Sequence, residues 1–159
     1  MGLLDMFFSK KETWDEIKKT DKVYPANSIS IFMLNTVSGQ PGTGWFDAGY
    51  EKYAYKKSCP YNFLIMVSLK DSIAIKNPGL DMGTIEDFFV QELRKVCIAH
   101  IVARVVTDEG LNIEMYLEQQ EPAMNHLRTI LENPNRLVSF NCEVTEDPEW
   151  TVIKELMSL

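Results

Sequence analysis

Residues 61–69 read Tyr-Asn-Phe-Leu-Ile-Met-Val-Ser-Leu. Apart from Asn62 and Ser68 the side chains are apolar or aromatic, and such a run is typical of a strand that is buried on both faces. A loop signal, Asn77-Pro78-Gly79, follows it. We therefore expect a central β-strand over residues 61–69.

The chain beyond this strand alternates between helical and strand patterns. Apolar residues at helical spacing predict two helices, and side chains that alternate between apolar and polar predict strands. The turn Asp108-Glu109-Gly110 joins two of these strands in a hairpin. The predicted elements, in chain order, are a helix with Thr84 as its N-cap and Asp87 completing a capping box, a strand over residues 97–107, a strand over residues 111–118, a helix that begins at Pro122 and a strand over residues 138–144.

Strand, helix, strand, strand, helix, strand is the order of a ferredoxin-like α+β fold. Two split βαβ units close into an antiparallel sheet with both helices on one face, and the first and third of the four strands are central. The alternating residues 28–35 predict one more strand, which extends the sheet or pairs at its edge. Glu146-Asp147-Pro148 opens a C-terminal helix. We expect an N-terminal helical extension over residues 1–27 and a single α+β domain over residues 28–159.

The segment between residues 38 and 56 is interpreted as a loop followed by a helix. Ser38-Gly39-Gln40-Pro41-Gly42-Thr43-Gly44 is the strongest loop signal in the chain. Trp45, Tyr50 and Tyr53 fit helical spacing, although aromatic residues also favour strands. We expect a helix over residues 45–56.

Charge is distributed unevenly along the chain. Residues 1–57 carry 8 basic and 7 acidic side chains, whereas residues 58–159 carry 8 basic and 16 acidic ones, so that +1 and −8 give the net charge of −7. An acidic surface without a stripe of Lys and Arg repels phosphate backbones. We therefore expect no nucleic acid among the partners.

The three cysteines, Cys59, Cys97 and Cys142, are odd in number and widely spaced, which is typical of reduced thiols in a cytoplasmic protein. No apolar run reaches the roughly 20 residues that span a bilayer, so we expect no integral membrane segment. Residues 1–10 contain a short apolar cluster. It predicts a short helix that packs on its own domain or on a neighbour, or else makes a peripheral contact with a membrane or a partner.

Four segments share their order and spacing with a known family. They are Trp45 with Tyr50 to Tyr53, Thr84-Ile85-Glu86-Asp87-Phe88, the turn Val106-Thr107-Asp108-Glu109-Gly110 with Tyr116 after it, and Glu146-Asp147-Pro148-Glu149-Trp150. Over residues 28–155 the chain resembles the bacterial domain-of-unknown-function family six-ninety-five, whose members often end in an Asp-Pro-Glu-Trp segment. That family is similar in fold to the regulator of ribonuclease E activity B, which acts by binding a protein. The resemblance implies a protein-binding role and supplies no catalytic residues.

No set of residues completes a catalytic, metal or cofactor site. Cys97 and His100 have Cys-x-x-His spacing, but residues three apart on a strand point to opposite faces and do not reach one ion. The thiols lack the base and the orienting group that a nucleophile requires. Gly39, Gly42 and Gly44 are not followed by the Lys-Ser/Thr of a phosphate-binding loop. We expect no catalytic residue, no metal and no cofactor.

The candidate binding residues lie on the two strands of the predicted hairpin. His100 and Arg104 are four apart on one strand, and Glu114, Tyr116 and Glu118 alternate on the next. All five are expected on the sheet face away from the helices. Our first hypothesis is a non-enzymatic protein-binding or regulatory module that docks a partner on this open face.

Two alternatives stay open. One is a small-molecule-binding protein or an unrecognised hydrolase, with a pocket between Trp45, Tyr50 and the sheet. A deep apolar cleft with converging polar groups would favour it, and a flat surface would exclude it. The other is a homo-oligomeric structural module that self-associates through the strand at residues 28–35 or through the first helix of the chain.

Overall fold

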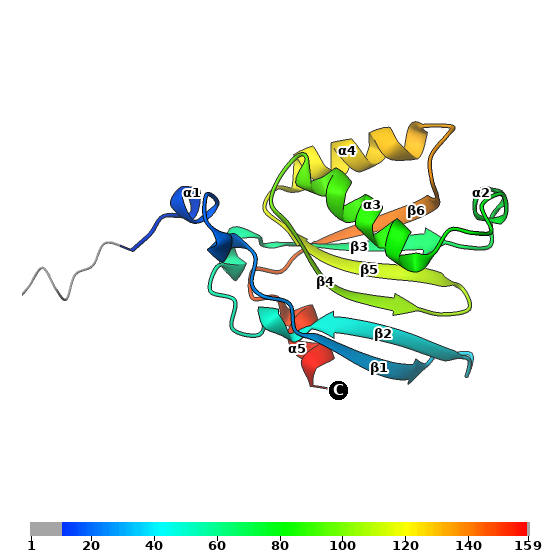
Figure 1. Ribbon diagram of the computed structural model, residues 1–159, viewed down its shortest axis with the longest axis horizontal. Coiled ribbons are helices and arrows are strands. Elements are labelled where there is room, and N and C mark those ends of the chain that lie inside the picture. The colour runs from blue at the N-terminus through cyan, green and yellow to red at the C-terminus, as the bar shows by residue number, and fades with distance from the viewer. Residues whose placement is uncertain (1–10, 159) are drawn as a thin grey trace, which may run out of the picture.

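The structure, a computed structural model, describes residues 11–158. Its centre is a six-stranded sheet in the order β1-β2-β4-β5-β3-β6, in which every neighbouring pair is antiparallel (Figure 1). The strands are β1 (Ile29–Asn35), β2 (Pro41–Asp47), β3 (Tyr61–Ser68), β4 (Ala99–Val106), β5 (Gly110–Leu117) and β6 (Ser139–Glu146). The α-helices are α1 (Trp14–Ile17), α2 (Ser72–Ile75), α3 (Met82–Arg94), α4 (Gln120–Glu132) and α5 (Thr151–Met157), and 3₁₀ turns cover Asp21–Val23, Ala48–Tyr50 and Lys56–Ser58.

The main core lies between the sheet and the two long helices. α3 and α4 lie side by side on one face of the sheet (Figure 1). Phe63 and Ile65 of β3 and Ile113 of β5 are fully buried against Ile85 and Phe89 of α3. The predicted apolar stripe of the first long helix and the predicted buried strand are thus confirmed. β3 and β5 each lie between two other strands, as expected for the first and third strands of the four.

A second cluster covers the opposite face around β4 and β5. Val102, Ala103 and Tyr116 come from these strands. Ile153 comes from α5, and Trp150 immediately precedes that helix. The turns between β2 and β3 complete the cluster. Because α5 and these turns pack against this face, the sheet is covered on both sides near its middle.

The helix expected over residues 45–56 is not formed, and the loop expected over residues 38–44 is shorter than predicted. β2 runs from the middle of the expected loop into the start of the expected helix, and it pairs with both β1 and β4. Gly44 allows this pairing, because a Cβ atom there would lie 2.5 Å from the Phe32 ring and 2.7 Å from the Arg104 carbonyl oxygen. Both errors have one cause. A glycine that indicates a turn can instead provide room for a neighbouring side chain within a strand.

The starts of the two long helices also differ from the prediction. The N-cap of α3 is Asp81, whose carboxylate accepts a hydrogen bond from the Thr84 amide at 2.8 Å. α4 begins at Gln120, two residues before Pro122. Asp and Thr are both good N-cap residues, and proline is tolerated throughout the first turn of a helix. The sequence pattern therefore locates these helices without deciding their first residue.

The N-terminal part of the described chain packs against the domain. Ile17 of α1 is fully buried, and Val23 is almost completely buried. Residues 1–10, for which the sequence predicts a short docking helix, lie outside the described residues. Within residues 11–158, no helix combines the length and the apolar character that crossing a membrane requires.

Candidate binding surface

The five residues predicted to share one sheet face do not all do so. β4 contains an irregularity, where its pairing with β5 shifts between Ile101 and Ala103. An extra residue moves the alternation of side chains by one position. Arg104 consequently points toward α3, where it contacts Glu86, while His100 points to the opposite face. The prediction that His100 and Arg104 share a face is therefore wrong, and the other four residues lie on the face opposite α3 and α4.

His100 is fully buried in a cluster of aromatic side chains. Its Nδ1 lies 3.0 Å from the Tyr50 hydroxyl, and its Nε2 lies 3.3 Å from the Tyr53 hydroxyl. The Trp150 ring packs against it. Burial, with a smaller contribution from the Arg94 charge, lowers the pKa of His100 to about 3. The imidazole is therefore neutral and shielded from solvent, and it does not offer a surface to a partner.

Tyr116 and the closing Asp-Pro-Glu-Trp segment form one structural unit. The Tyr116 hydroxyl donates to the Asp147 carboxylate at 2.6 Å, and its ring stacks on Trp150 with 4.2 Å between the ring centroids. The Trp150 indole N–H donates to the carbonyl oxygens of Lys56 and Cys59. Burial would raise the pKa of Asp147, but hydrogen bonds from Tyr116 and from the start of α5 lower it below its ordinary value. The segment that carries the family resemblance thus fastens α5 to the sheet.

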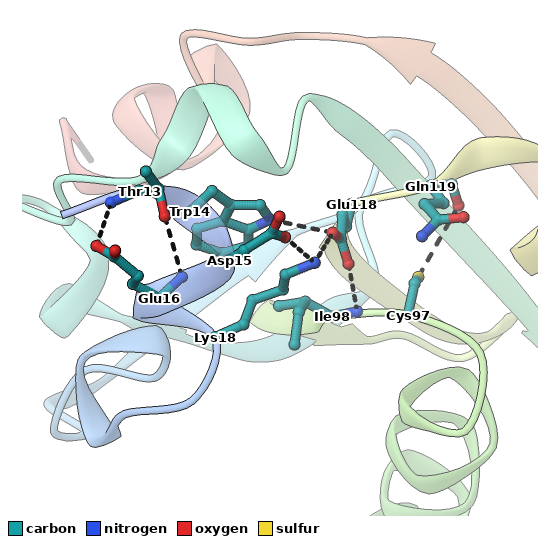
Figure 2. A network of polar contacts seen from close by, with 9 residues as sticks. All are labelled: Thr13, Trp14, Asp15, Glu16, Lys18, Cys97, Ile98, Glu118 and Gln119. Carbon is teal, nitrogen blue, oxygen red and sulfur yellow. Dashed lines mark hydrogen bonds and ion pairs between the residues drawn. The ribbon is translucent and has the colours of Figure 1, made fainter.

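Glu118 joins α1 to the sheet (Figure 2). Its carboxylate accepts hydrogen bonds from the Trp14 indole N–H at 3.0 Å, the Lys18 ammonium at 2.9 Å and the Ile98 amide at 3.2 Å. Burial would raise the pKa of Glu118, but these donors outweigh it and leave the pKa below its ordinary value. The carboxylate is therefore used within the chain and holds the first helix in place.

Glu114 also has a partner within the domain. Its carboxylate accepts a hydrogen bond from the Asn62 side-chain amide at 2.9 Å, and burial raises its pKa. Like Glu118, it is only partly exposed, whereas His100 and Tyr116 are fully buried. The face that the sequence predicts to be open is therefore closed at these residues by α5, α1 and the turns after β2.

The face that carries α3 and α4 is covered incompletely, because the β1–β2 hairpin extends beyond α3 (Figure 1). A groove of about 620 Å³ lies between α3 and this part of the sheet. Its apolar lining includes Ile29, Trp45, Val90 and Ile101, and Tyr50 closes one side. The charged residues that line it are Asp47, Glu86, Asp87, Arg94 and Arg104. This is where the sequence places a pocket, between Trp45, Tyr50 and the sheet.

Two arginines contribute polar groups to this groove. Arg104 Nη1 donates to the Glu86 carboxylate at 2.7 Å, while its buried Nε has no hydrogen-bond partner among residues 11–158. Burial raises the pKa of Glu86, and the Arg104 charge opposes that effect. The Arg94 guanidinium lies 4.1 Å from the centre of the Tyr24 ring, and its Nε donates to the Ala99 carbonyl. Glu86 of α3 thus forms an ion pair with the sheet.

Strand β1 exposes three aliphatic side chains in a row. Ile29, Ile31 and Met33 alternate along the strand and are 51%, 81% and 78% exposed. The residues between them point to the other face, where Phe32 packs against Phe46. A single exposed aliphatic residue needs no explanation, but three on one side of one strand indicate a binding surface.

The backbone of β1 is unpaired on its outer side. The Ala48 N–H donates to the Ser28 carbonyl and the Thr36 N–H to the Gln40 carbonyl, both at 2.8 Å. Along an antiparallel strand the N–H and C=O groups point alternately to its two sides. The even-numbered residues therefore face β2, and the odd-numbered residues from 29 to 35 direct their N–H and C=O groups outward. Because β1 is the last strand of the sheet, no other described strand pairs with these groups.

The hairpin carries no charged residue before Asp47, the last residue of β2. No Asp, Glu, Lys or Arg lies between Lys22 and Asp47, in a chain of which 25% of the residues are charged. Natural edge strands are usually protected against association by charges, proline or a bulge. β1 has none of these, and it pairs with β2 without a register shift. The gap in charge is visible in the sequence and is the signal that locates this surface, whereas the alternation of polar residues pointed to the opposite face.

The polar side chains that line the groove include carboxylates, guanidinium groups and tyrosine hydroxyls. None of the described residues that line it is a Ser, Thr, Cys, His or Lys. Burial raises the pKa of Cys59 and, with the Glu143 charge nearby, raises the pKa of Cys142 to about 12. Within residues 11–158, no three His, Cys, Asp or Glu side chains gather closely enough to hold a metal ion. The groove and the free edge of β1 together suit binding through shape, apolar contact and backbone hydrogen bonds.

No protein-family model matches the sequence, and no curated protein matches it either.

Proposed function

We propose that this protein is a non-enzymatic protein-binding module, and that it binds an extended segment of its partner along the free edge of β1. One observation carries the proposal: this edge presents three exposed aliphatic side chains together with unpaired backbone groups. An added strand satisfies the backbone groups with hydrogen bonds and covers the side chains with its own. An uncharged edge without proline or bulge otherwise invites aggregation, so a specific occupant explains why it is left open.

The arrangement of the core supports the same proposal. We assign β3 to β6, with α3 and α4, to a ferredoxin-like core, since the four strands follow the order β4-β5-β3-β6 and the two helices share one face. The β1–β2 hairpin is then an addition beside β4. The resemblance to family six-ninety-five, and through it to the regulator of ribonuclease E activity B, implies a protein-binding role and agrees with this use of the hairpin.

The substitution Ile31→Lys tests the proposal. The full-length protein, carrying an affinity tag, is used to capture proteins from a cell lysate, and the captured set is compared between the wild type and the variant. Ile31 is 81% exposed, so the variant should fold normally. A lysine in the middle of an apolar contact leaves a charge without a partner, and we expect the retained amount of any specific partner to fall by about tenfold or more.

Val37→Lys is the matched control. Val37 lies in the turn between β1 and β2 and is fully exposed, so its substitution adds the same charge to the same hairpin without disturbing the strand. We expect this variant to capture the same proteins as the wild type. Equal capture by all three proteins would mean that the β1 edge is not the binding surface.

The groove beside α3 supports a second candidate function, the binding of a small anionic molecule. The observation in its favour is the buried Arg104 Nε without a hydrogen-bond partner in the described chain, in a groove that Arg94 also lines. Thermal unfolding in the presence of inorganic phosphate and of simple dicarboxylates tests it. A rise in Tm that disappears in Arg104→Gln would favour this function, and the absence of any rise would leave the groove as a feature of the protein-binding surface.

A further inference from the structure

We infer that the occupant of the β1 edge is a second copy of this chain. Two copies pair their β1 strands in antiparallel fashion about a two-fold axis at Ile31, and their two sheets join into one. This inference rests on the proposed function, because it names the partner of the same edge. It is drawn from the backbone pattern, the side chains and the charge of the hairpin.

The backbone pattern of β1 is self-complementary. With Ile31 on the axis, Ile31 of one copy faces Ile31 of the other, and Ile29 faces Met33. All three residues direct their N–H and C=O groups away from β2, so each facing pair exchanges two hydrogen bonds. A shift by one residue would oppose outward groups with inward ones and lose these bonds. Registers that oppose odd-numbered residues to each other keep these bonds, and of these the one centred on Ile31 pairs Ile29, Ile31 and Met33 only with one another.

The side chains match in the same register. Ile29, Ile31 and Met33 are exposed on the face of the sheet that carries α3. A two-fold axis perpendicular to the sheet places the α3 faces of both copies on the same side. The aliphatic side chains of the two copies then form one continuous apolar patch across the axis, and cross-strand pairs of this kind stabilise a sheet.

Charge favours a second copy at this edge and at no other. The protein has a net charge of −7, so most approaches of two copies bring like charges together. Strand β1 lies within the longest uncharged stretch of the sequence, from residue 23 to residue 46. The opposite edge of the sheet, β6, carries Glu143 and Glu146. Pairing through β1 opposes no charges, whereas a charged segment of another protein would find no counter-charge on this strand.

The oligomeric state of the full chain tests the inference. Sedimentation equilibrium over a wide concentration range should give twice the monomer mass of 18.3 kDa. In Ile31→Lys, two lysines would oppose each other on the axis, and we expect a monomer at concentrations where the wild type is a dimer. Val37→Lys, which adds its charge in the turn, should remain a dimer.

Engineered cysteines test the register. The Cα atoms of a hydrogen-bonded antiparallel pair are about 5.5 Å apart, within the span of a disulfide, so Ile31→Cys should form a covalent dimer on mild oxidation. Met33→Cys is the control. In the proposed register the cysteines at position 33 of the two chains are offset by four residues, roughly 13 Å along the strand. They should not cross-link above the wild-type level.

Each outcome separates this inference from the proposed function. A wild type that stays monomeric at every concentration, or a dimer that Ile31→Lys leaves intact, overturns the second copy as occupant. If Ile31→Lys nevertheless abolishes capture of another protein, the β1 edge binds that protein and the proposed function stands. If Ile31→Lys affects neither association nor capture, both are wrong. Cross-linking through Met33→Cys in place of Ile31→Cys overturns the proposed register.

Discussion

The imidazole of His100 lies between the hydroxyls of Tyr50 and Tyr53, in a place where water does not reach it. A histidine on a strand four residues before an arginine suggests a polar, solvent-facing pair. Here the aromatic side chains of the β2–β3 turns and Trp150 cover it. Such cover comes from parts of the chain distant in sequence, which alternation within one strand does not reveal.

The buried state of His100 predicts a loss of stability in mild acid. Its pKa is about 3 in the folded chain against an ordinary value of 6.5. Between these values the unfolded chain binds a proton that the folded chain does not. The free energy of unfolding should therefore fall as the pH decreases below 6.5, by up to about 1.4 kcal/mol per pH unit.

His100→Phe should flatten this dependence, whatever its effect on stability at pH 7. Urea unfolding between pH 7 and pH 5 measures both slopes. Glu86 and Glu114, whose pKa values are raised by burial, contribute with the opposite sign in both proteins, so the difference between the two slopes reports His100. Equal slopes for the wild type and the variant would contradict a neutral, buried His100.

Tyr116→Phe should lower the free energy of unfolding by about 1.5–3 kcal/mol, because it removes a buried hydrogen bond to a carboxylate. The lost contact is the 2.6 Å bond from the Tyr116 hydroxyl to the Asp147 carboxylate. The same carboxylate also accepts a hydrogen bond from Thr151 at the start of α5. Urea unfolding at neutral pH measures the effect. Tyr61→Phe is the control, since the Tyr61 hydroxyl makes no hydrogen bond within residues 11–158, and it should change stability by less than about 0.5 kcal/mol. A Tyr116→Phe variant as stable as this control would contradict the role of the bond.

At the scale of the elements, the sequence predicts well where side-chain periodicity is undisturbed. Strands β3, β5 and β6 and helices α3 and α4 follow it closely, because each buries one regular apolar face. Periodicity fails at β2, where Gly44 provides space for Phe32, and at the irregularity in β4, which moves Arg104 to the other face. Both features depend on contacts with a neighbouring strand, and no pattern within a single element indicates them.

Gly44→Ala should destabilise the β1–β2 hairpin, because its Cβ would lie 2.5 Å from the Phe32 ring and 2.7 Å from a carbonyl oxygen. We expect the free energy of unfolding to fall by about 1–3 kcal/mol, as is usual for overpacking. Gly79→Ala is the matched control, since a Cβ there has no neighbour within 4 Å. Thermal or urea unfolding of the two variants makes the comparison, and equal stability would show that the close approach at Gly44 is unimportant.

Glu118→Gln should loosen α1 more than it destabilises the domain. The variant loses the charge that holds the Lys18 ammonium and weakens the bond to the Trp14 indole. Such a charge-assisted contact stabilises by about 1.5–3 kcal/mol. We expect amide hydrogen exchange in residues 14–18 to accelerate by about tenfold or more.

The control for this change is Glu12→Gln, which breaks an ion pair with Lys22 whose side chains are both exposed. Exposed pairs contribute little, so exchange in α1 should be nearly unchanged. Equal exchange rates in the two variants would mean that Glu118 does not anchor the helix.

At the scale of the whole molecule, the distribution of charge along the chain and the incomplete cover of the sheet by helices both point to the β1–β2 hairpin. α3 and α4 cover the inner strands, and the β1–β2 hairpin extends past them (Figure 1). The side chains of Ile29, Ile31 and Met33 in β1 are exposed. The sequence predicts the strand at the edge and a pocket beside Trp45. One of its alternatives names the strand at residues 28–35 as a self-association contact. The first hypothesis instead places the binding surface on the opposite face, where the polar residues that look available are used in internal hydrogen bonds. The more informative signal is the absence of charge from residue 23 to residue 46.

Amide hydrogen exchange along β1 tests the central claim, that its outer edge is a binding surface, most directly. The N–H groups of Ile29, Ile31 and Met33 point outward, and those of Ser30, Phe32 and Leu34 are bonded to β2. We predict that the outward amides become protected when the protein concentration is raised or a captured partner is added, while protection of the inward amides is unchanged. Outward amides that exchange as fast as an unfolded chain under all of these conditions would contradict the claim.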